Sequence, residues 1–121
     1  MIFAGIGFRK HAGIESLRDA LRAAGANNAH ALATAEDKAA APVIQALAAE
    51  LALPLHAIPL ESLLNQRTLT QSTRVQARYG IGSLAEAAAL AAAGPGARLL
   101  GPRVTSEDGN ATAAIAERSI P

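Results

Sequence analysis

The stretch FAGIGFRKHAGIESLRDALRAAG, residues 3–25, decides the fold class, because a strand, a glycine turn and a helix follow one another in it without interruption. Residues 1–6 form an apolar run that predicts a buried strand. Residues 13–24 predict an amphipathic helix, and Gly25 supplies its C-terminal stop. The apolar face of this helix is formed by Ile14, Leu17 and Leu21. The chain therefore opens as a strand followed by a helix.

The alternation of strand and helix repeats twice more along the chain. A second strand is predicted at residues 30–35, and Pro42 suits the first turn of the helix that follows. Pro54 ends that helix, and a third strand at 55–59 precedes a short helical turn at 60–66. The apolar stripe of the second helix contains Ile44, Leu47, Ala48 and Leu51. Repeated units of this kind favour parallel strands that lie side by side.

The order of elements changes after residue 66. A short helix is predicted at 72–79, and a Gly-x-Gly turn separates it from a long Ala-rich helix. Ser83 and Glu86 have the spacing of a capping box, in which the hydroxyl accepts from a backbone N–H and the carboxylate reaches back to the cap. This pair marks the start of the Ala-rich helix, and the GPG segment at 94–96 ends it.

Two strands close the chain, at about residues 98–104 and 111–116. The segment Asp108–Asn110 lies between them and suits a hairpin turn, which adds an antiparallel pair to the parallel units. The sequence thus predicts an α/β protein. We expect a single three-layer α/β/α domain over residues 1–121, with a mixed, mostly parallel sheet of about five strands.

The composition limits the classes of function. A chain of 121 residues fits one domain, and the absence of cysteine excludes disulfides and thiolate metal sites and favours the cytoplasm. Eleven Lys and Arg against ten Asp and Glu, with two Phe and one Tyr, argue against a nucleic-acid partner. The longest apolar run, at 87–93, is shorter than the roughly 20 residues that span a bilayer. We expect a cytoplasmic protein with no membrane partner.

The glycine turn at residues 5–7 leads into a group of basic side chains. GIGFRK has Arg9 where a dinucleotide-binding fingerprint needs its third glycine, so that motif is incomplete. A glycine-rich turn between strand and helix still lets backbone N–H groups face an anion. Arg9, Lys10 and His11 follow the first strand and Lys38 follows the second, which suits a ligand rich in carboxylates or phosphates. A purely structural turn with ordinary solvated charges remains the alternative.

Neither a metal site nor a catalytic motif can be identified from the residues. His11, His30 and His56 are spread singly, without a carboxylate at ligand spacing, so we expect no metal and no cofactor. The sequence has no G-x-S-x-G elbow and no Walker motif. The residues alone therefore indicate an α/β domain with an edge that favours anions, and they do not declare an enzyme.

Four blocks of the sequence together resemble one family. They read GIGFRKHAG from residue 5, ALATAEDKAAAPVIQALAAELALPL from residue 31, QSTRVQARYGIGSLAEAAALAAAG from residue 71 and ARLLGPRVTSEDGNATAAIAE from residue 97. The resemblance is to the CobE proteins of cobalamin (vitamin B12) biosynthesis and to the homologous C-terminal domain of CbiG, the cobalt-precorrin lactone hydrolase. CbiG-type proteins carry a further N-terminal domain and open a lactone in the anaerobic route. Because this chain begins directly at the first strand, we expect the free-standing CobE form of the aerobic route.

The resemblance implies a ligand and a site. Corrin and precorrin intermediates carry many acetate and propionate groups on an apolar macrocycle, which calls for basic side chains at the rim and small residues beneath. Arg9, Lys10 and Lys38 would supply the charges, and a helix cap would already occupy the oxygen of Ser83. The full set of expected binding residues is Gly5, Gly7, Arg9, Lys10, Lys38, Ser72, Gly80, Gly82, Ser83, Asn110 and Thr112.

Three functions remain open from the sequence. The first is a protein that binds, carries or hands over a corrin or precorrin intermediate. The second is an enzyme of the ring-contraction steps, a hydrolase related to CbiG, with Lys38 or His11 as acid or base. The third is an interaction module that stabilises a complex with other cobalamin biosynthesis enzymes.

Overall fold

The first strand of the chain lies in the middle of a six-stranded sheet with the order β3-β2-β1-β6-β4. β5 also pairs with β6, on the same side of it as β4. The computed structural model describes residues 1–118, without the side chains of Asn27 and Arg74. The strands are β1 (Ile2–Phe8), β2 (Ala31–Ala35), β3 (Leu55–Ile58), β4 (Arg98–Leu99), β5 (Val104–Thr105) and β6 (Ala111–Glu117).

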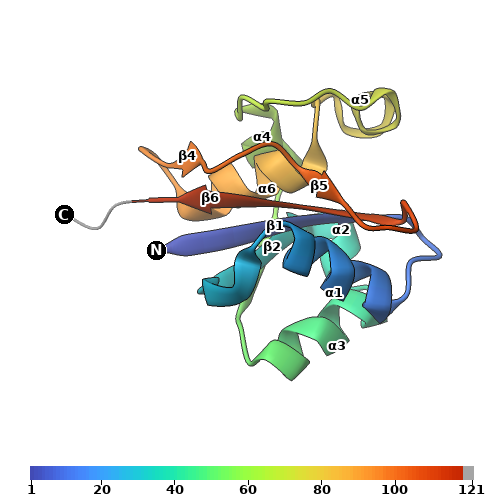
Figure 1. Cartoon of the computed structure of the whole chain (residues 1–121). Helices are drawn as coiled ribbons and strands as arrows, with labels where there is room; N and C mark the ends of the chain where they lie inside the picture. Colours follow the sequence, from blue (N-terminus) through green and yellow to red (C-terminus); the bar gives the residue numbers. More distant parts are fainter. Residues whose placement is uncertain (119–121) are drawn as a thin grey trace.

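The predicted three-layer α/β/α fold is confirmed (Figure 1). α1 and α3 cover one face of the sheet, and α6 covers the other with α4 and α5 outside it. The short helices α2 and η1 were not predicted. The helices are α1 (Ile14–Ala23), η1 (Ala26–Asn28), α2 (Glu36–Ala39), α3 (Pro42–Leu51), α4 (Leu60–Leu64), α5 (Thr73–Tyr79) and α6 (Leu84–Ala93). None of the described helices is long and apolar enough to cross a membrane.

The sheet is mixed, as predicted, and β6 accounts for all of its antiparallel pairing. β1 pairs in parallel with β2, and β2 with β3, as expected of consecutive β–α units. β6 pairs antiparallel with β1, β4 and β5. Three antiparallel pairings therefore stand beside two parallel ones, because the last strand enters between β1 and the short strands that precede it.

The two faces of the sheet are packed by different means. The face toward α1 and α3 is filled by large aliphatic side chains, which bury the most apolar area. On the other face, small residues form the contact where α6 crosses β1. A Cβ added to Gly5 would lie 1.9 Å from the backbone oxygen of Ala85, so α6 sits directly on the β1 backbone. The large core side chains of the first face are Ile6, Leu17, Leu32, Ile44 and Leu47.

The predicted strand at 98–104 is wrong as a continuous element, since the structure splits it into β4 and β5. Pro102 has no N–H to donate to β6. The next N–H, that of Arg103, donates to the Glu86 carboxylate at 2.8 Å instead. The Leu100 N–H still donates to the Ile115 oxygen of β6 at 2.9 Å, so the chain leaves the sheet at residues 101–103, and six strands replace the five that were expected.

Two smaller predictions need correction. Ser83 caps α6 as predicted, since its Oγ accepts from the Glu86 N–H at 3.3 Å, but the Glu86 carboxylate does not complete the capping box. That carboxylate bonds the backbone of other segments instead. In α3, Leu51 does not belong to the buried stripe. It is 41 % exposed, because the helix ends there and the chain turns at Ala52.

The first and last described residues pair with each other. The N-terminal amine of Met1 donates to the Arg118 oxygen at 3.1 Å, and the Arg118 N–H donates back to Met1 at 3.0 Å. This pair continues the β1–β6 ladder beyond Ile2 and Glu117. The other end of the ladder, where Phe8 pairs with Ala111, lies on the right of Figure 1.

Candidate functional site

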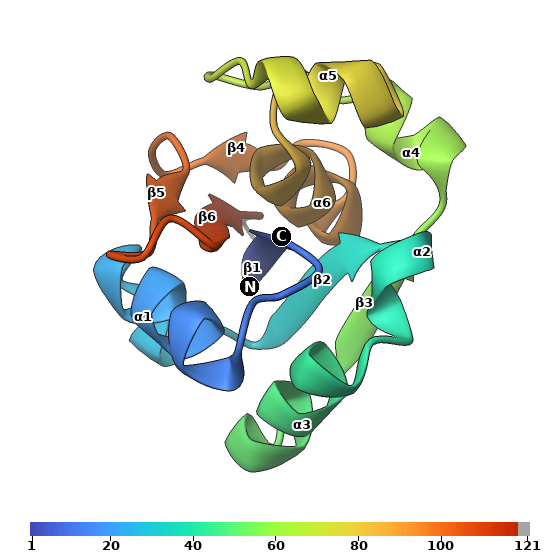
Figure 2. The ribbon, with the colours of Figure 1, turned by 90° about the vertical axis from the view of Figure 1, so that its right-hand side faces the viewer.

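A cleft of about 1070 Å³ opens at the carboxyl ends of β1 and β2. Its lining comes from the loop after β1, from α2, from the start of α3, from α5, from the start of α6 and from the β5–β6 hairpin. Figure 2 looks onto this end of the sheet, with α5, α2, α3 and α1 arranged around it. This is the edge at which open α/β sheets bind ligands.

Basic side chains predominate around the cleft. Five of the chain's eleven Lys and Arg residues line it, against one of its ten Asp and Glu residues, among the residues that the structure describes. The whole chain carries a net charge of only +1, so positive charge is gathered at this edge. The basic residues of the cleft are Arg9, Lys10, Lys38, Arg78 and Arg103.

Apolar side chains line the cleft between these charges. They are Phe8 at the end of β1, Val43 in α3, Val75 in α5 and Leu84 in α6. Two ten-residue helices, α3 and α6, begin at the cleft, where the partial positive charge of a helix N-terminus favours anions. The site therefore combines apolar contact area with positive potential.

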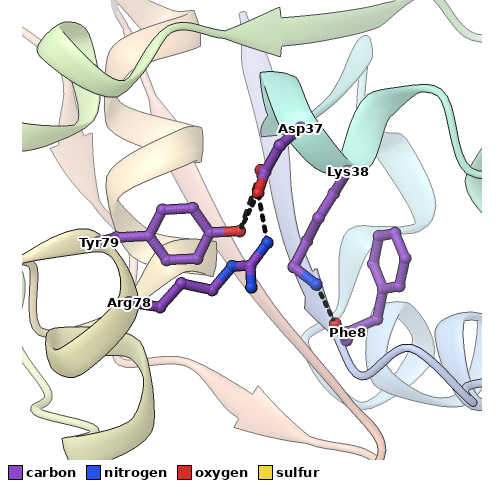
Figure 3. A network of polar contacts seen from close by, with 5 residues as sticks. All are labelled: Phe8, Asp37, Lys38, Arg78 and Tyr79. Carbon is purple, nitrogen blue, oxygen red and sulfur yellow. Dashed lines mark hydrogen bonds and ion pairs between the residues drawn. The ribbon is translucent and has the colours of Figure 1, made fainter.

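Lys38 is fixed across the end of β1. Its Nζ donates to the Phe8 carbonyl oxygen at 2.7 Å and lies 4.9 Å from the centre of the Phe8 ring. Both contacts hold the partly buried ammonium between the ends of β1 and β2, as Figure 3 shows. The charge of Lys38 is thus in a defined position at the cleft.

α5 is tied to α2 by a three-residue network (Figure 3). Arg78 Nη2 donates to Asp37 Oδ2 at 2.8 Å, and the Tyr79 hydroxyl donates to Asp37 Oδ1 at 3.0 Å. Burial opposes ionisation of Asp37, but the hydrogen bonds from Arg78 and Tyr79 outweigh it and lower the pKa of the carboxyl. Burial also raises the pKa of the Tyr79 phenol. Asp37 is therefore a carboxylate and Tyr79 a neutral donor at neutral pH.

The β5–β6 hairpin is held against the loop after β1. The Arg9 N–H donates to the Asn110 oxygen at 2.9 Å. Asp108 organises the turn, since its carboxylate accepts from the hydroxyls of Ser16 and Ser106 and from the Asn110 N–H. The hydrogen bond from Ser16 in α1, followed by those from Ser106 and Asn110, lowers the pKa of Asp108 to about 2. Arg9 and Asn110 are thereby placed side by side at the rim.

The buried side chain of Glu86 holds two segments that form walls of the cleft. Its side chain has no exposed surface, and its carboxylate accepts from the N–H of Leu69 at 2.5 Å and from the N–H and hydroxyl of Thr70 at 3.0 and 2.8 Å. It also accepts from the Arg103 N–H. One buried carboxylate thus joins the segment before α5 and the segment before β5 to the first turn of α6.

The structure brings most of the expected binding residues together and separates three from the rest. The residues that line the cleft are Gly7, Arg9, Lys10, Lys38, Ser72, Ser83, Asn110 and Thr112. Gly5 lies under α6, where its missing side chain admits the helix rather than a ligand. Gly80 ends α5 with a φ of 75°, and Gly82 admits the loop at Thr68–Gln71, whose atoms come within 2.6 Å of the position of a Cβ.

The hydroxyls that were expected at the cleft from the sequence have partners within the protein. Ser72 caps α5 through the Val75 N–H at 3.4 Å, and Ser83 caps α6 and has no exposed surface. The Thr112 hydroxyl donates weakly to the Gly7 oxygen at 3.5 Å. Among the expected hydroxyl groups, those of Ser72 and Thr112 retain partial exposure toward a ligand.

The histidines lie apart from one another. His11 is exposed at the cleft, His30 accepts from the Ile2 N–H through Nδ1 at 2.9 Å, and His56 packs its ring edge against Phe3. Within residues 1–118, no group of three or more His, Asp or Glu side chains is placed to hold a metal ion. His11 is thus the histidine that a ligand in the cleft would meet.

Sequence reasoning missed five polar residues of the cleft, one of which is Thr105 at the end of β5. Asp37 directly precedes Lys38 after the second strand, so the end of that strand could have pointed to it. Arg78 and Tyr79 directly precede the second Gly-x-Gly turn, which could have pointed to them. Arg103 offers no such signal. Its place depends on the contact between its backbone and buried Glu86, which only the folded chain creates.

The fold and the cleft define a three-layer α/β domain with a basic ligand-sized cleft at the carboxyl ends of its parallel strands. The chain belongs to the family described as cobalamin synthesis G C-terminus, whose model matches residues 2–116. It is thus a member of a cobalamin biosynthesis family, as the sequence blocks indicated.

Solved structures agree with this assignment. CobE, a protein from the cobalamin (vitamin B12) biosynthetic pathway, is 34 % identical over 96 % of this chain and 89 % of its own, with a TM-score of 0.84. Cobalamin biosynthesis protein chiG from Agrobacterium tumefaciens str. C58 is 34 % identical over 99 % of this chain and 100 % of its own, with a TM-score of 0.76. No curated protein sequence gives a significant match.

Proposed function

We propose that the chain binds a corrin or precorrin intermediate of cobalamin biosynthesis in the basic cleft and carries it or hands it over. The observation that carries the proposal is the gathering of five Lys and Arg side chains around one cleft of about 1070 Å³. Membership of a cobalamin biosynthesis family supplies the class of ligand. The intermediates of this class join an apolar ring to many carboxylates, which is the combination that the lining offers.

The size and chemistry of the cleft suit such a ligand. Small-molecule sites typically enclose about 300–1,000 Å³, so this cleft of about 1070 Å³ is slightly larger than that range and has room for a macrocycle. Phe8, Val43, Val75 and Leu84 offer apolar contact to the ring. The basic side chains stand around them, where they can form charge-assisted hydrogen bonds with carboxylates.

Titration of the purified protein with hydrogenobyrinic acid, a cobalt-free corrin polycarboxylic acid, tests the proposal. We expect a change in the visible spectrum of the corrin, its co-migration with the protein on gel filtration in a one-to-one ratio, and weaker binding at higher salt because exposed charges are screened. An unchanged spectrum together with separate elution would refute the binding function.

A second candidate function, an enzyme of the ring-contraction steps, uses the same cleft. The observation that favours it is that His11 and Lys38, two side chains able to transfer protons, both line the cleft. Because hydrogenobyrinic acid already has the contracted ring, mass spectrometry after incubation with a precorrin from before the contraction separates the two functions. An unchanged mass supports a carrier, and the gain or loss of a fragment supports an enzyme. If the protein binds neither the corrin nor a precursor, the remaining candidate is an interaction module that stabilises a complex of biosynthetic enzymes.

A further inference from the structure

Among the described residues that line the cleft, Asp37 is the single acid, and it lies where an anionic ligand would be expected. Its carboxylate accepts from Arg78 and from Tyr79, two donors on α5, and its neighbour along the chain is Lys38. In Figure 3 the Arg78 guanidinium and the Tyr79 hydroxyl both face the Asp37 carboxylate, and the Lys38 side chain extends from the neighbouring position toward Phe8. These are the groups that recognise a carboxylate.

We propose that Asp37 takes the place of a ligand carboxylate: it holds Arg78 and Tyr79 in the ligand-free protein, and a carboxylate of the bound ligand displaces it. Arg78 and Tyr79 are then binding residues, prepared in advance by an acid of the protein itself. This inference rests on the proposed function, since it needs a polycarboxylate ligand in the cleft.

Because the Asp37–Arg78 ion pair is exposed, breaking it costs little free energy. The side chains of Asp37 and Arg78 are 45 % and 62 % exposed, and exposed ion pairs contribute little to stability. Asp37 can therefore turn into solvent at the end of α2 without leaving a buried charge unpaired. Arg78 has five N–H donors, and its contact with Asp37 uses Nη2. The guanidinium is therefore able to form a bidentate pair of hydrogen bonds with a ligand carboxylate.

Tyr79 gives the donor pair its fixed position. Its residue is only 9 % exposed and its ring packs in the core cluster with Leu63, Ile81 and Leu84. The Arg78 guanidinium lies 5.4 Å from the centre of the same ring, within cation–π range. The ring thus anchors α5, so the hydroxyl and the guanidinium stay at the cleft when their carboxylate partner changes.

The first test needs no ligand, because Tyr79 is the sole tyrosine of a chain without tryptophan. A phenol that donates to a carboxylate has quenched emission, so tyrosine fluorescence reports directly on the contact with Asp37. We expect Asp37→Asn to increase the emission and Glu36→Gln, which neutralises the preceding acid of α2, to leave it unchanged. Equal emission in the two variants would show that the network is absent in solution and would overturn the inference.

The second test measures the affinity of the same variants for hydrogenobyrinic acid, with thermal melting as the check on folding. We expect Asp37→Asn to bind about two- to fivefold more tightly than the unchanged protein, the range that corresponds to removal of competition from an exposed ion pair. Arg78→Ala should bind about tenfold more weakly. Glu36→Gln, as the matched change of charge outside the cleft lining, should bind like the unchanged protein.

The double variant Asp37→Asn/Arg78→Ala isolates the exchange from general electrostatics. When Arg78 is absent, there is no guanidinium to release, so we expect removal of the Asp37 charge to tighten binding less than it does in the protein that keeps Arg78. If the unchanged protein binds the corrin but Asp37→Asn binds no more tightly than Glu36→Gln, the inference is wrong and the proposed function stands. If neither the unchanged protein nor any variant binds, the proposed function fails and the exchange fails with it.

Discussion

The carboxylate of Glu86 accepts a hydrogen bond from the backbone N–H of Arg103 at 2.8 Å, although 17 positions separate the two residues. The same carboxylate accepts from Leu69 and Thr70 and is buried without exposed surface. A buried carboxylate of this kind is stabilised by its donors, and the donors depend on it in turn. Two segments that form walls of the cleft are therefore held by one side chain.

Replacement of Glu86 by Gln is expected to destabilise the fold. An amide keeps one acceptor oxygen but turns its NH₂ toward backbone donors, so buried N–H groups lose their partner. We expect the free energy of unfolding to fall by about 2–4 kcal/mol. Chemical denaturation measures this change. Glu117→Gln is the matched control, because Glu117 forms an exposed pair with Arg98, and it should cost less than about 1 kcal/mol. Equal decreases in the two variants would contradict the role of Glu86.

Gly5→Ala is expected to disrupt the contact between β1 and α6. The added Cβ would lie 1.9 Å from the Ala85 oxygen and 2.6 Å from the Ala89 nitrogen, both backbone atoms that cannot rotate away. The helix must therefore shift off the sheet, which we expect to cost about 3 kcal/mol of stability. Thermal melting compares it with Gly101→Ala, whose Cβ would meet nothing within 4 Å and which should change stability by less than about 0.5 kcal/mol. A fully stable Gly5→Ala protein would show that α6 packs less closely than described.

Asp108 is expected to contribute stability that depends on pH. Its hydrogen bonds lower the pKa from 3.8 to about 2 in the folded chain, so the folded state binds its proton less readily than the unfolded state does. The stabilisation is therefore complete above about pH 4 and disappears as the pH falls toward about 2. Chemical denaturation should give different free energies of unfolding for the unchanged protein and for Asp108→Asn at neutral pH. This difference in free energy should disappear near pH 2. Glu107 is an exposed acid of the same turn, so Glu107→Gln serves as the control. If the free energies of unfolding of the unchanged protein and Asp108→Asn differ by the same amount at every pH, Asp108 is not the source of the pH dependence.

Arg9→Ala is expected to weaken corrin binding, in contrast to Arg98→Ala. Arg9 lines the cleft, whereas Arg98 lies on β4 and pairs with Glu117, the residue opposite the first residue of β1. Removal of a charge-assisted hydrogen bond at an exposed position corresponds to about a tenfold decrease in affinity. Titration with hydrogenobyrinic acid at low and moderate salt measures both variants. If Arg9→Ala and Arg98→Ala are both folded and bind the corrin with equal affinity, Arg9 is an ordinary solvated charge.

Most of the fold could be predicted from the sequence because its signals are local. The apolar run before the glycine turn gave β1, and Ser83 marked the start of α6. The split of the strand at 98–104 could not be predicted, since it arises where the Arg103 N–H leaves the sheet for Glu86. Leu51 followed the helical period, but its exposure is set by the end of the helix rather than by the period.

The candidate site was predictable where it depends on the ends of strands. Arg9, Lys10 and Lys38 come together at one cleft because β1 and β2 are parallel, so their carboxyl ends share an edge. Contributions from α5 and from the β5–β6 hairpin depend on contacts across the fold. The Asp37–Arg78 pair joins positions 41 residues apart, and no periodicity in the sequence carries that information.

The position of β6 has a consequence for how the chain is made. The last strand, Ala111–Glu117, pairs with the first along its whole length, and β4 and β5 join the sheet through it. While the polypeptide grows on the ribosome, one edge of β1 stays open until β6 has been synthesised. Contacts of such long sequence separation slow folding. The domain therefore completes its fold only once residues 111–117 are present, and fragments that stop short of residue 111 expose an apolar strand edge to aggregation.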